Sequence, residues 1–278
     1  MTRSLFALAS AIMVLAGLPS AAHAIDCARA SAPIDHTICD DSTLRRADSA
    51  LGRAYAAILK AAPDPEIHAM LIASQKRWIA ARDRTYGGDG RTGKTALEPL
   101  LLDAIETRTK VLTRMSKDTP RRPVLIQTAL RQRQFAAQFS GGAFAGFDTS
   151  CDFFPSDPSD QGGEYQCFAT HHLQNHDRIC SQQLDWATYR IYATQSVANV
   201  VEGKPKLVAL CKDDGCGDDA TGAKAGWNRH PDAASAGAFP RSLPQLDAEV
   251  IDSMVDDEPS WLKACLTDER FPRAVSGR

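Results

Sequence analysis

Eight cysteines constrain the fold of this 278-residue chain most strongly, because all of them follow an amino-terminal segment with the pattern of an export signal. An even number of cysteines in an exported chain favours disulfides over metal sites or reactive thiols. We therefore expect four disulfides and an oxidising compartment. The cysteines are Cys27, Cys39, Cys151, Cys167, Cys180, Cys211, Cys216 and Cys265.

Residues 1–24 are predicted to be a signal peptide. Arg3 supplies the positive charge, residues 5–18 form an apolar run too short for a stable membrane span, and residues 22–24 (Ala-His-Ala) form a cleavage site. Cleavage there leaves Ile25 first, so that the first cysteine is the third mature residue and no lipid anchor is expected. No later stretch is apolar enough to span a membrane. We expect a periplasmic or secreted protein with no membrane anchor after signal cleavage.

Residues 25–115 have the apolar periodicity of a small all-α domain. Pro33 with Ser31 before it predicts one helix start, and Asp41 or Ser42 caps a second helix. Residues 63–65 (Pro-Asp-Pro) end that helix and start a third, and Thr95 leads a fourth. Each helix has one narrow apolar stripe, so the helices must pack on each other. The predicted core positions are Leu44, Ala47, Leu51, Tyr55 and Ile58 in the second helix, Ile67, Leu71, Ser74, Trp78 and Ala81 in the third, and Leu97, Leu101, Ala104, Ile105, Val111 and Leu112 in the fourth.

Two further features of this domain bear on its stability and on binding. A disulfide between Cys27 and Cys39 closes a short loop and adds roughly 3 kcal/mol by restricting the unfolded chain. Gln75, Trp78 and Arg82 share one side of the third helix. Either Trp78 packs in the core, with Arg82 or Asp83 paired to a neighbouring helix, or this side contacts a partner.

An ordered set of residues in this segment resembles the N-terminal domain of LprI-type lysozyme inhibitors, which is also catalogued as a domain of unknown function. The set comprises Cys27, Ile38, Cys39, Leu44, Tyr55, Gln75, Trp78, Arg82, Asp83, Arg108 and Leu112. The resemblance covers about a third of the chain and implies a small helical secreted domain that blocks peptidoglycan-cleaving lysozymes. Members of the family usually carry one cysteine shortly after the Arg-Asp pair and another before the last helix. This chain has neither, and Thr85, Tyr86 and a glycine-rich run follow its Arg-Asp pair. The second disulfide of the family is therefore missing.

The remaining chain has a different composition. Residues 116–123 contain two prolines and interrupt the helical pattern, so they are predicted to be a linker. Residues 124–278 are predicted to form a disulfide-rich, mainly antiparallel β domain with flanking helices, which makes the chain α+β. The expected elements are a helix over 124–139, strands over 165–170 and 186–194, a hairpin from 197–201 and 207–211, and short helices over 246–254 and 261–266. Six cysteines allow fifteen pairings, which sequence does not distinguish.

The charge distribution bears on the class of partner. Residues 201–269 carry 7 basic and 14 acidic side chains. This excess of acidic side chains argues against a nucleic acid as the partner, because proteins bind nucleic acids through basic patches. It favours a basic protein partner through electrostatic steering, with a solvated acidic surface as the simpler alternative.

Signals for catalysis and metal binding are weak. His171, His172 and His176 lie near Cys180 in the sequence, but their spacing matches no closed metal site, and an oxidised cysteine is no ligand. Four aspartates between residues 213 and 219 lack the alternate spacing of a calcium loop. The chain contains no nucleophile elbow, phosphate loop or dinucleotide fingerprint. We expect a protein with no enzymatic activity, cofactor or metal. A cell-wall hydrolase is the least favoured alternative, since the paired carboxylates of such an enzyme are set by three-dimensional distance and not by a sequence motif.

The stretch from Cys211 to Cys216 is the most suggestive binding feature. If these two cysteines pair, the loop that contains Lys212, Asp213 and Asp214 becomes rigid and loses little entropy on entering a cleft. Its spacing resembles the short disulfide loop of Ivy-type lysozyme inhibitors, although only the cysteines and the lysine match. An ordinary surface turn, with each cysteine paired elsewhere, is the alternative.

These observations together predict an exported binding protein that inhibits lysozyme by covering the glycan cleft. The expected partner is a secreted lysozyme or another basic envelope protein. The partner-binding candidates are Lys212, Asp213, Asp214, Trp78 and Arg82. The alternative is an envelope interaction or immunity protein that binds another secreted effector.

Overall fold

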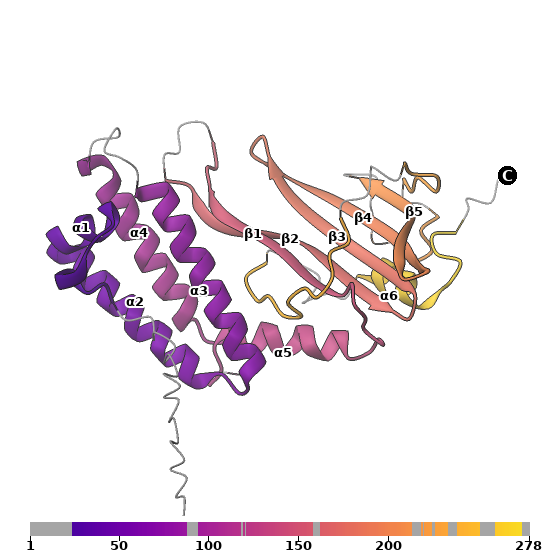
Figure 1. Cartoon of the computed structure of the whole chain (residues 1–278), viewed down its shortest axis with the longest axis horizontal. Coiled ribbons are helices and arrows are strands. Elements are labelled where there is room, and N and C mark those ends of the chain that lie inside the picture. The colour runs from indigo at the N-terminus through magenta and orange to yellow at the C-terminus, as the bar shows by residue number, and fades with distance from the viewer. Residues whose placement is uncertain are drawn as a thin grey trace, which may run out of the picture.

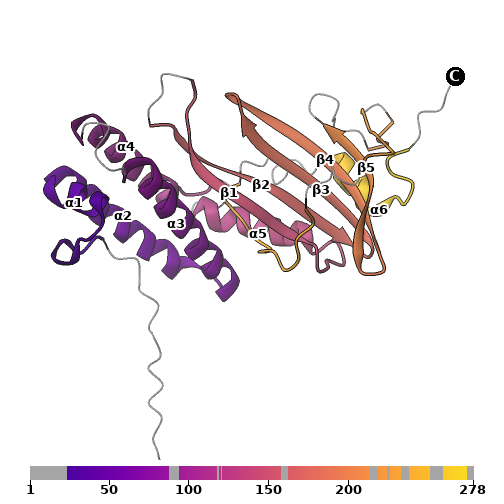
Figure 2. The ribbon, with the colours of Figure 1, turned by 45° about the horizontal axis from the view of Figure 1, so that its top comes forward.

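The computed structural model describes residues 24–87, 94–117, 119, 121–157, 162–212, 218, 220–223, 226–232, 238–250 and 259–273. Helices α1 to α4 form one end of the molecule, and a five-stranded sheet extends from them (Figures 1 and 2). Helix α5 connects the two parts and runs along the sheet, while α6 lies at the far end. Among the described residues, no helix combines the length and apolar character that a membrane span requires.

The four helices begin close to the positions that the sequence predicts, and α2 ends just before the predicted stop at residues 63–65. Their bounds are Pro33–Asp40 for α1, Ser42–Ala61 for α2, Pro65–Tyr86 for α3 and Lys94–Thr113 for α4. Asp41 caps α2 by accepting from the amides of Thr43 and Leu44, and Asp64 caps α3 in the same way. Helix α1 begins at Pro33 as predicted, but its N-cap residue is Ala32 and not Ser31.

The predicted apolar stripes form one helical core. Ile34 and Ile38 of α1 join Leu44, Leu51 and Ile58 of α2 in this core. The buried members from α3 and α4 include Ile67, Leu71, Trp78, Leu101, Ala104, Ile105 and Leu112. The side chain of Leu97 lies outside the described residues. Burial of the stripes stabilises helices that have too little apolar area to be stable alone.

The helical core also includes residues from beyond the predicted linker. Helix α5, Val124–Ala136, contributes Leu125, Ile126 and Ala129, and the C-terminal region contributes Leu246. Within the predicted linker, Met115 and Pro123 form an isolated bridge and the Ser116 amide donates to the Arg122 carbonyl. The domain boundary at residue 115 stays a prediction, but the core continues across it.

The five strands form an antiparallel meander in the order β1-β2-β3-β4-β5. Their bounds are Gly146–Phe154, Glu164–Asn175, Arg178–Ala187, Arg190–Val201 and Lys204–Lys212. One face packs on α6, Ser260–Thr267, and on the C-terminal end of α5, around Leu173, Cys180 and Val197. The α+β class is therefore confirmed, with helices on one side of an antiparallel sheet.

The structure corrects two predicted elements. Residues 186–194 do not form one strand, because β3 ends at Ala187 and β4 begins at Arg190. The turn residues Thr188 and Tyr189 both have positive φ, at 50° and 59°, without the glycine or asparagine that normally signals such a turn. In the second predicted element, residues 246–250 are not helical, and residues 251–254 lie outside the described residues. The 246–250 segment is held instead by contacts to α3, α4, α5 and β2.

Three disulfides connect described elements. They join Cys27 to Cys39, Cys151 to Cys167 and Cys180 to Cys265. The first is the predicted pairing, the second joins directly opposite positions of β1 and β2, and the third fastens α6 to β3. Cys211 is also disulfide-bonded, and Cys216 lies outside the described residues. Several disulfides in one chain are typical of proteins outside the cytoplasm.

The Leu246→Ala variant tests whether the C-terminal region stabilises the helical core. Leu246 is 5% exposed, so truncation should lower the free energy of unfolding by about 2–5 kcal/mol, as measured by urea denaturation. Val201→Ala is the matched control, since Val201 is 49% exposed and its truncation should change stability by no more than about 0.5 kcal/mol. An equal loss of unfolding free energy in the two variants would show that residue 246 is not part of the core.

Candidate functional site

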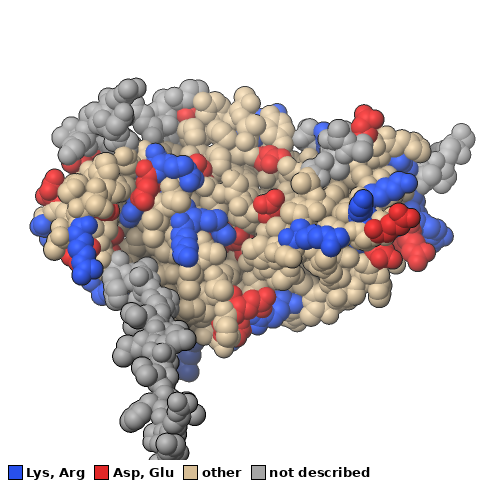
Figure 3. Space-filling view, in the orientation of Figure 1, with Lys and Arg blue, Asp and Glu red and all other residues tan. Residues whose placement is uncertain are grey.

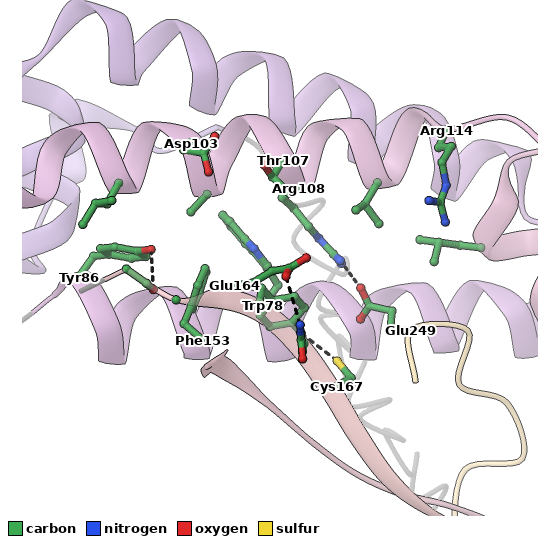
Figure 4. Close-up of a pocket in the computed structure, with 18 of the residues that line it drawn as sticks. Trp78, Tyr86, Asp103, Thr107, Arg108, Arg114, Phe153, Glu164, Cys167 and Glu249 are labelled. Atoms are coloured by element: carbon green, nitrogen blue, oxygen red, sulfur yellow. Dashed lines mark hydrogen bonds and ion pairs between the residues drawn. The ribbon is translucent and has the colours of Figure 1, made fainter. Parts of the chain in front are cut away.

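A cavity of about 660 Å³ lies where the helices meet the sheet. Its size is within the range of small-molecule pockets. Side chains from α3, α4 and the adjoining ends of β1 and β2 point into it (Figure 4). The lining includes Trp78, Tyr86, Asp103, Thr107, Arg108, Arg114, Phe153, Glu164, Tyr165 and Glu249.

Arg108 is the central charged residue of this cavity. It projects from α4, where helical periodicity places it on the same face as Leu101, Ile105 and Leu112, and it is only 2% exposed. Its guanidinium donates to the Gln75 side chain at 3.0 Å, to the Ser74 hydroxyl at 2.7 Å and to the Glu249 carboxylate.

The Arg108 guanidinium also lies 5.9 Å from the centre of the Tyr165 ring. Burial raises the pKa of the Tyr165 phenol well above its usual range, with the nearby Glu249 carboxylate adding to the effect. The phenol therefore remains neutral at physiological pH.

A second buried ion pair lies beside the first. Arg77 of α3 donates to the Asp247 carboxylate at 2.8 Å. The Gln132 side chain of α5 bonds both backbone groups of Asp247, donating to its carbonyl at 2.8 Å and accepting from its amide at 3.0 Å. Burial raises the pKa of the Asp247 carboxyl, and the charge of Arg77 opposes that rise. The 243–250 segment is therefore held against three helices by charged and polar groups.

The cavity combines a buried, paired cation with charged side chains at its rim. Its buried cation is already paired with Glu249, while Asp103, Glu164 and Arg114 are exposed at the rim. Among the described residues that line the cavity there is no histidine and no free thiol, since Cys167 is in a disulfide. These side chains can hold a partner group by shape and by the rim charges.

Two predicted site residues belong to the helical core. Trp78 is 1% exposed and Arg82 is 5% exposed, so the packing interpretation of Trp78 is confirmed. The Arg82 guanidinium lies 5.5 Å from the centre of the Trp78 ring and donates to the Asp83 carboxylate at 2.7 Å. Arg82 and Asp83 thus pair with each other, and not with a neighbouring helix as predicted. A role of Trp78 and Arg82 in partner contact stays a prediction.

The other predicted site residues lie far from Trp78 and Arg82. Lys212 is exposed at the end of β5, which is the edge strand opposite β1, and β1 is the strand that contacts α3 (Figure 1). Asp213 and Asp214 lie outside the described residues. The structure therefore separates the two groups of candidates.

The predicted cluster of histidines in and after β2 does not converge on one point. His171 and His172 are neighbours in β2, so their side chains point to opposite faces of the sheet. The ring of His171 stacks on Phe147 at 3.9 Å, and Nδ1 of His172 lies 2.7 Å from the Ser181 hydroxyl. Cys180 is disulfide-bonded, and the described residues contain no group of three metal-ligating side chains.

An exposed aromatic hairpin was not predicted from the sequence. In the β3–β4 hairpin tip, residues 186–191, Tyr189 is 43% exposed and Ile191 is 49% exposed. The Trp186 ring packs edge-on against Tyr189 at 5.8 Å and lies 5.1 Å from the Phe154 ring. The run of aromatic and branched residues predicted a strand, and only the positive φ values of the two turn residues reveal the tip.

The comparisons with known proteins match one part of the chain. Residues 27–112 match the model of the family described as Lysozyme inhibitor LprI. The predicted resemblance of this segment is thus confirmed, and the matched residues comprise α1 to most of α4. No curated protein and no solved structure matches the chain.

The Arg108→Ala variant tests the buried ion pair. It should lower the free energy of unfolding by about 3–5 kcal/mol, because it leaves the Glu249 carboxylate buried without its cation. Arg114→Ala, which removes an exposed guanidinium at the cavity rim, is the matched control and should cost no more than about 0.5 kcal/mol. A similar loss for both variants in chemical denaturation would contradict this assignment.

The buried histidines should make the protein less stable in acid. Burial lowers the pKa of His171 to about 3 and that of His172 to about 4. The unfolded chain, with histidine pKa values near 6.5, then binds protons that the folded chain does not. Stability should fall as the pH falls below about 6.5, by about 2 kcal/mol for each histidine at pH 5.

Thermal unfolding between pH 7 and pH 5 measures this effect. The double variant His171→Gln and His172→Gln should show a smaller loss over this range. The His36→Gln variant, at an exposed position, should lose as much stability between pH 7 and pH 5 as the unaltered protein. Identical pH profiles for the double variant and the unaltered protein would show that these two residues are not responsible.

Proposed function

We propose that this protein is exported and inhibits a lysozyme by covering its glycan-binding cleft. The match of residues 27–112 to the family described as Lysozyme inhibitor LprI carries this proposal. A lysozyme recognises peptidoglycan in an open cleft that contains two carboxyl groups. A rigid protein surface that seats there excludes the substrate without any chemical reaction.

Several features support export. The first 24 residues have the composition of a signal peptide, and the disulfides favour an oxidising compartment such as the periplasm or the exterior. The Cys27–Cys39 bridge lies within the matched segment and joins the short 3-10 helix Cys27–Arg29 to α1.

Lys212 is the best placed of the predicted contact residues. It is exposed, and the preceding Cys211 is 1% exposed and disulfide-bonded, which holds the end of β5 in position. Because the strand end is fixed, pairing of the ammonium group with the cleft carboxylates costs only the ordering of the lysine side chain, about 0.5–1.5 kcal/mol. We place Asp213 and Asp214 in the same contact. Trp78 and Arg82 are weaker candidates because both are buried.

The β3–β4 hairpin tip is a second surface on the sheet that suits protein contact. Exposed aromatic side chains are enriched at interfaces because they bury large areas with few rotatable bonds. On the face seen in Figure 3, Lys and Arg alternate with Asp and Glu over both the helices and the sheet, so this face shows no large field of one sign. A partner of the hairpin tip would therefore be recognised more by shape complementarity than by electrostatic steering.

The alternative function is an envelope interaction or immunity protein that binds a different secreted effector. The family match stops at residue 112, and the sheet with its exposed tip lies beyond it. A partner of the sheet need not be the partner of the helices.

Inhibition of cell-wall lysis tests the proposal. The oxidised, full-length mature protein should abolish lysis by a lysozyme at a stoichiometric ratio. Lys212→Ala should weaken inhibition about tenfold or more while changing stability by less than about 0.5 kcal/mol. Lys206→Ala is the matched control, because Lys206 is an exposed lysine on the same strand.

The pattern of variants distinguishes the surfaces. Loss of inhibition with Tyr189→Ala, and not with Lys212→Ala, would assign the contact to the hairpin tip. Equal inhibition by Lys212→Ala and Lys206→Ala would remove the 212–214 stretch from the mechanism. Absence of inhibition against c-type, g-type and i-type lysozymes would favour the alternative function.

A further inference from the structure

Asp48 is a buried carboxylate on the core side of α2. It is 7% exposed and accepts a hydrogen bond from the backbone nitrogen of Ile25 at 2.7 Å. A buried carboxylate normally has a cation or several donors as partners. Burial raises the pKa of Asp48, while the Ile25 amide and the charge of Arg82 oppose this rise and the charge of Asp35 adds to it.

The segment that carries Ile25 is held in place on both sides of its nitrogen. The Ile25 side chain packs against the helical core, and Cys27 is bonded to Cys39 at the end of α1. Asp26 caps the short 3-10 helix Cys27–Arg29 by accepting from the Ala28 amide. The nitrogen of residue 25 therefore has a defined position beside Asp48.

The predicted signal cleavage site is the bond that ends at this nitrogen. An export protease hydrolyses the bond between the Ala24 carbonyl carbon and the Ile25 nitrogen. The hydroxyl of water goes to the Ala24 carboxyl group and a hydrogen goes to the nitrogen. The new amine takes up a further proton at neutral pH, because an α-amino group has a pKa of about 7.7–8.0.

We propose that Asp48 is a receptor for the α-ammonium group of Ile25, so that removal of the signal peptide completes a partly buried ion pair in the helical domain. This inference rests on the export step of the proposed function, and not on lysozyme binding. The neutral amide donor of the precursor becomes a charged donor at the same position, and a charged donor makes a stronger hydrogen bond to a carboxylate.

The surroundings suit an ammonium group. A small cavity of about 90 Å³ adjoins the pair and is lined by Ile25, Asp48, Tyr55, Gln75, Trp78 and Arg82. An ammonium has three N–H donors, of which Asp48 accepts one, and the cavity leaves room for the solvation of the others. The Arg82 guanidinium is directed to Asp83, which leaves the Asp48 carboxylate for Ile25.

The test compares two forms of the full mature chain, one that begins at Ile25 and one with Gly-Ser added before it. The added residues keep the N–H group of Ile25 and remove its charge. At pH 7 the form that begins at Ile25 should unfold about 3–10 °C above the extended form. The Asp48→Asn substitution in both forms should abolish this difference, whereas Asp40→Asn, at an exposed position of α1, should leave it unchanged.

The difference in unfolding temperature between the two forms should depend on pH in a defined direction. The ion pair should raise the pKa of the α-amino group above its ordinary value. While the Asp48 carboxyl is ionised, the stabilisation is complete below about pH 7.5 and is lost as the pH rises through the folded pKa of the α-amino group. A titration of the Ile25 α-amino group by NMR should show the raised pKa.

Three outcomes would overturn the proposal. They are equal unfolding temperatures for the two forms, an α-amino group that titrates at its ordinary value, and a mass spectrum of the exported protein that shows an N-terminus other than Ile25. None of these measurements depends on lysozyme, so a failure of inhibition leaves this inference intact.

Discussion

The buried guanidinium of Arg108 connects parts of the chain that are far apart in the sequence. It lies on α4, bonds Ser74 and Gln75 of α3, and pairs with Glu249 of the C-terminal region. A guanidinium that is fully removed from water needs all of these partners, since an unpaired buried charge is strongly destabilising. The 243–250 segment therefore takes part in the packing of the helices, although it follows the whole sheet in the sequence.

This dependence joins the helices to the sheet. The segment from Pro244 onward bonds β1 through the Phe147 amide and places Leu246 in the helical core. The Arg77–Asp247 pair then holds the same segment to α3. The part of the chain that matches an inhibitor family is consequently in direct contact with a part that has no match, and its cavity is lined by both.

The predicted and observed site residues differ for a physical reason. The periodicity of apolar residues shows which face of a helix a residue occupies, but it does not show which other residues pack against that face. Helical periodicity correctly placed Trp78 on an inward face, but it did not include Arg108 among the predicted core positions. It did not reveal that Glu249 would be the partner of Arg108, because that pairing spans 141 positions of sequence. The β3–β4 turn was missed for a different reason, since Thr188 and Tyr189 favour strands and have positive φ only within the closed hairpin.

The sequence by itself determined the bounds of α2, the start of α3, the apolar stripes of the helical region, the Cys27–Cys39 bridge and the antiparallel character of the sheet. These features depend on local chemistry: caps, prolines, periodicity and a short disulfide loop. Only the tertiary structure decided the other disulfide pairings, the course of residues 246–250 and the cavity between helices and sheet. Those features depend on contacts between residues that are distant in the sequence, and these contacts form only when charged and apolar groups are buried together. Local sequence patterns contain no information about such contacts.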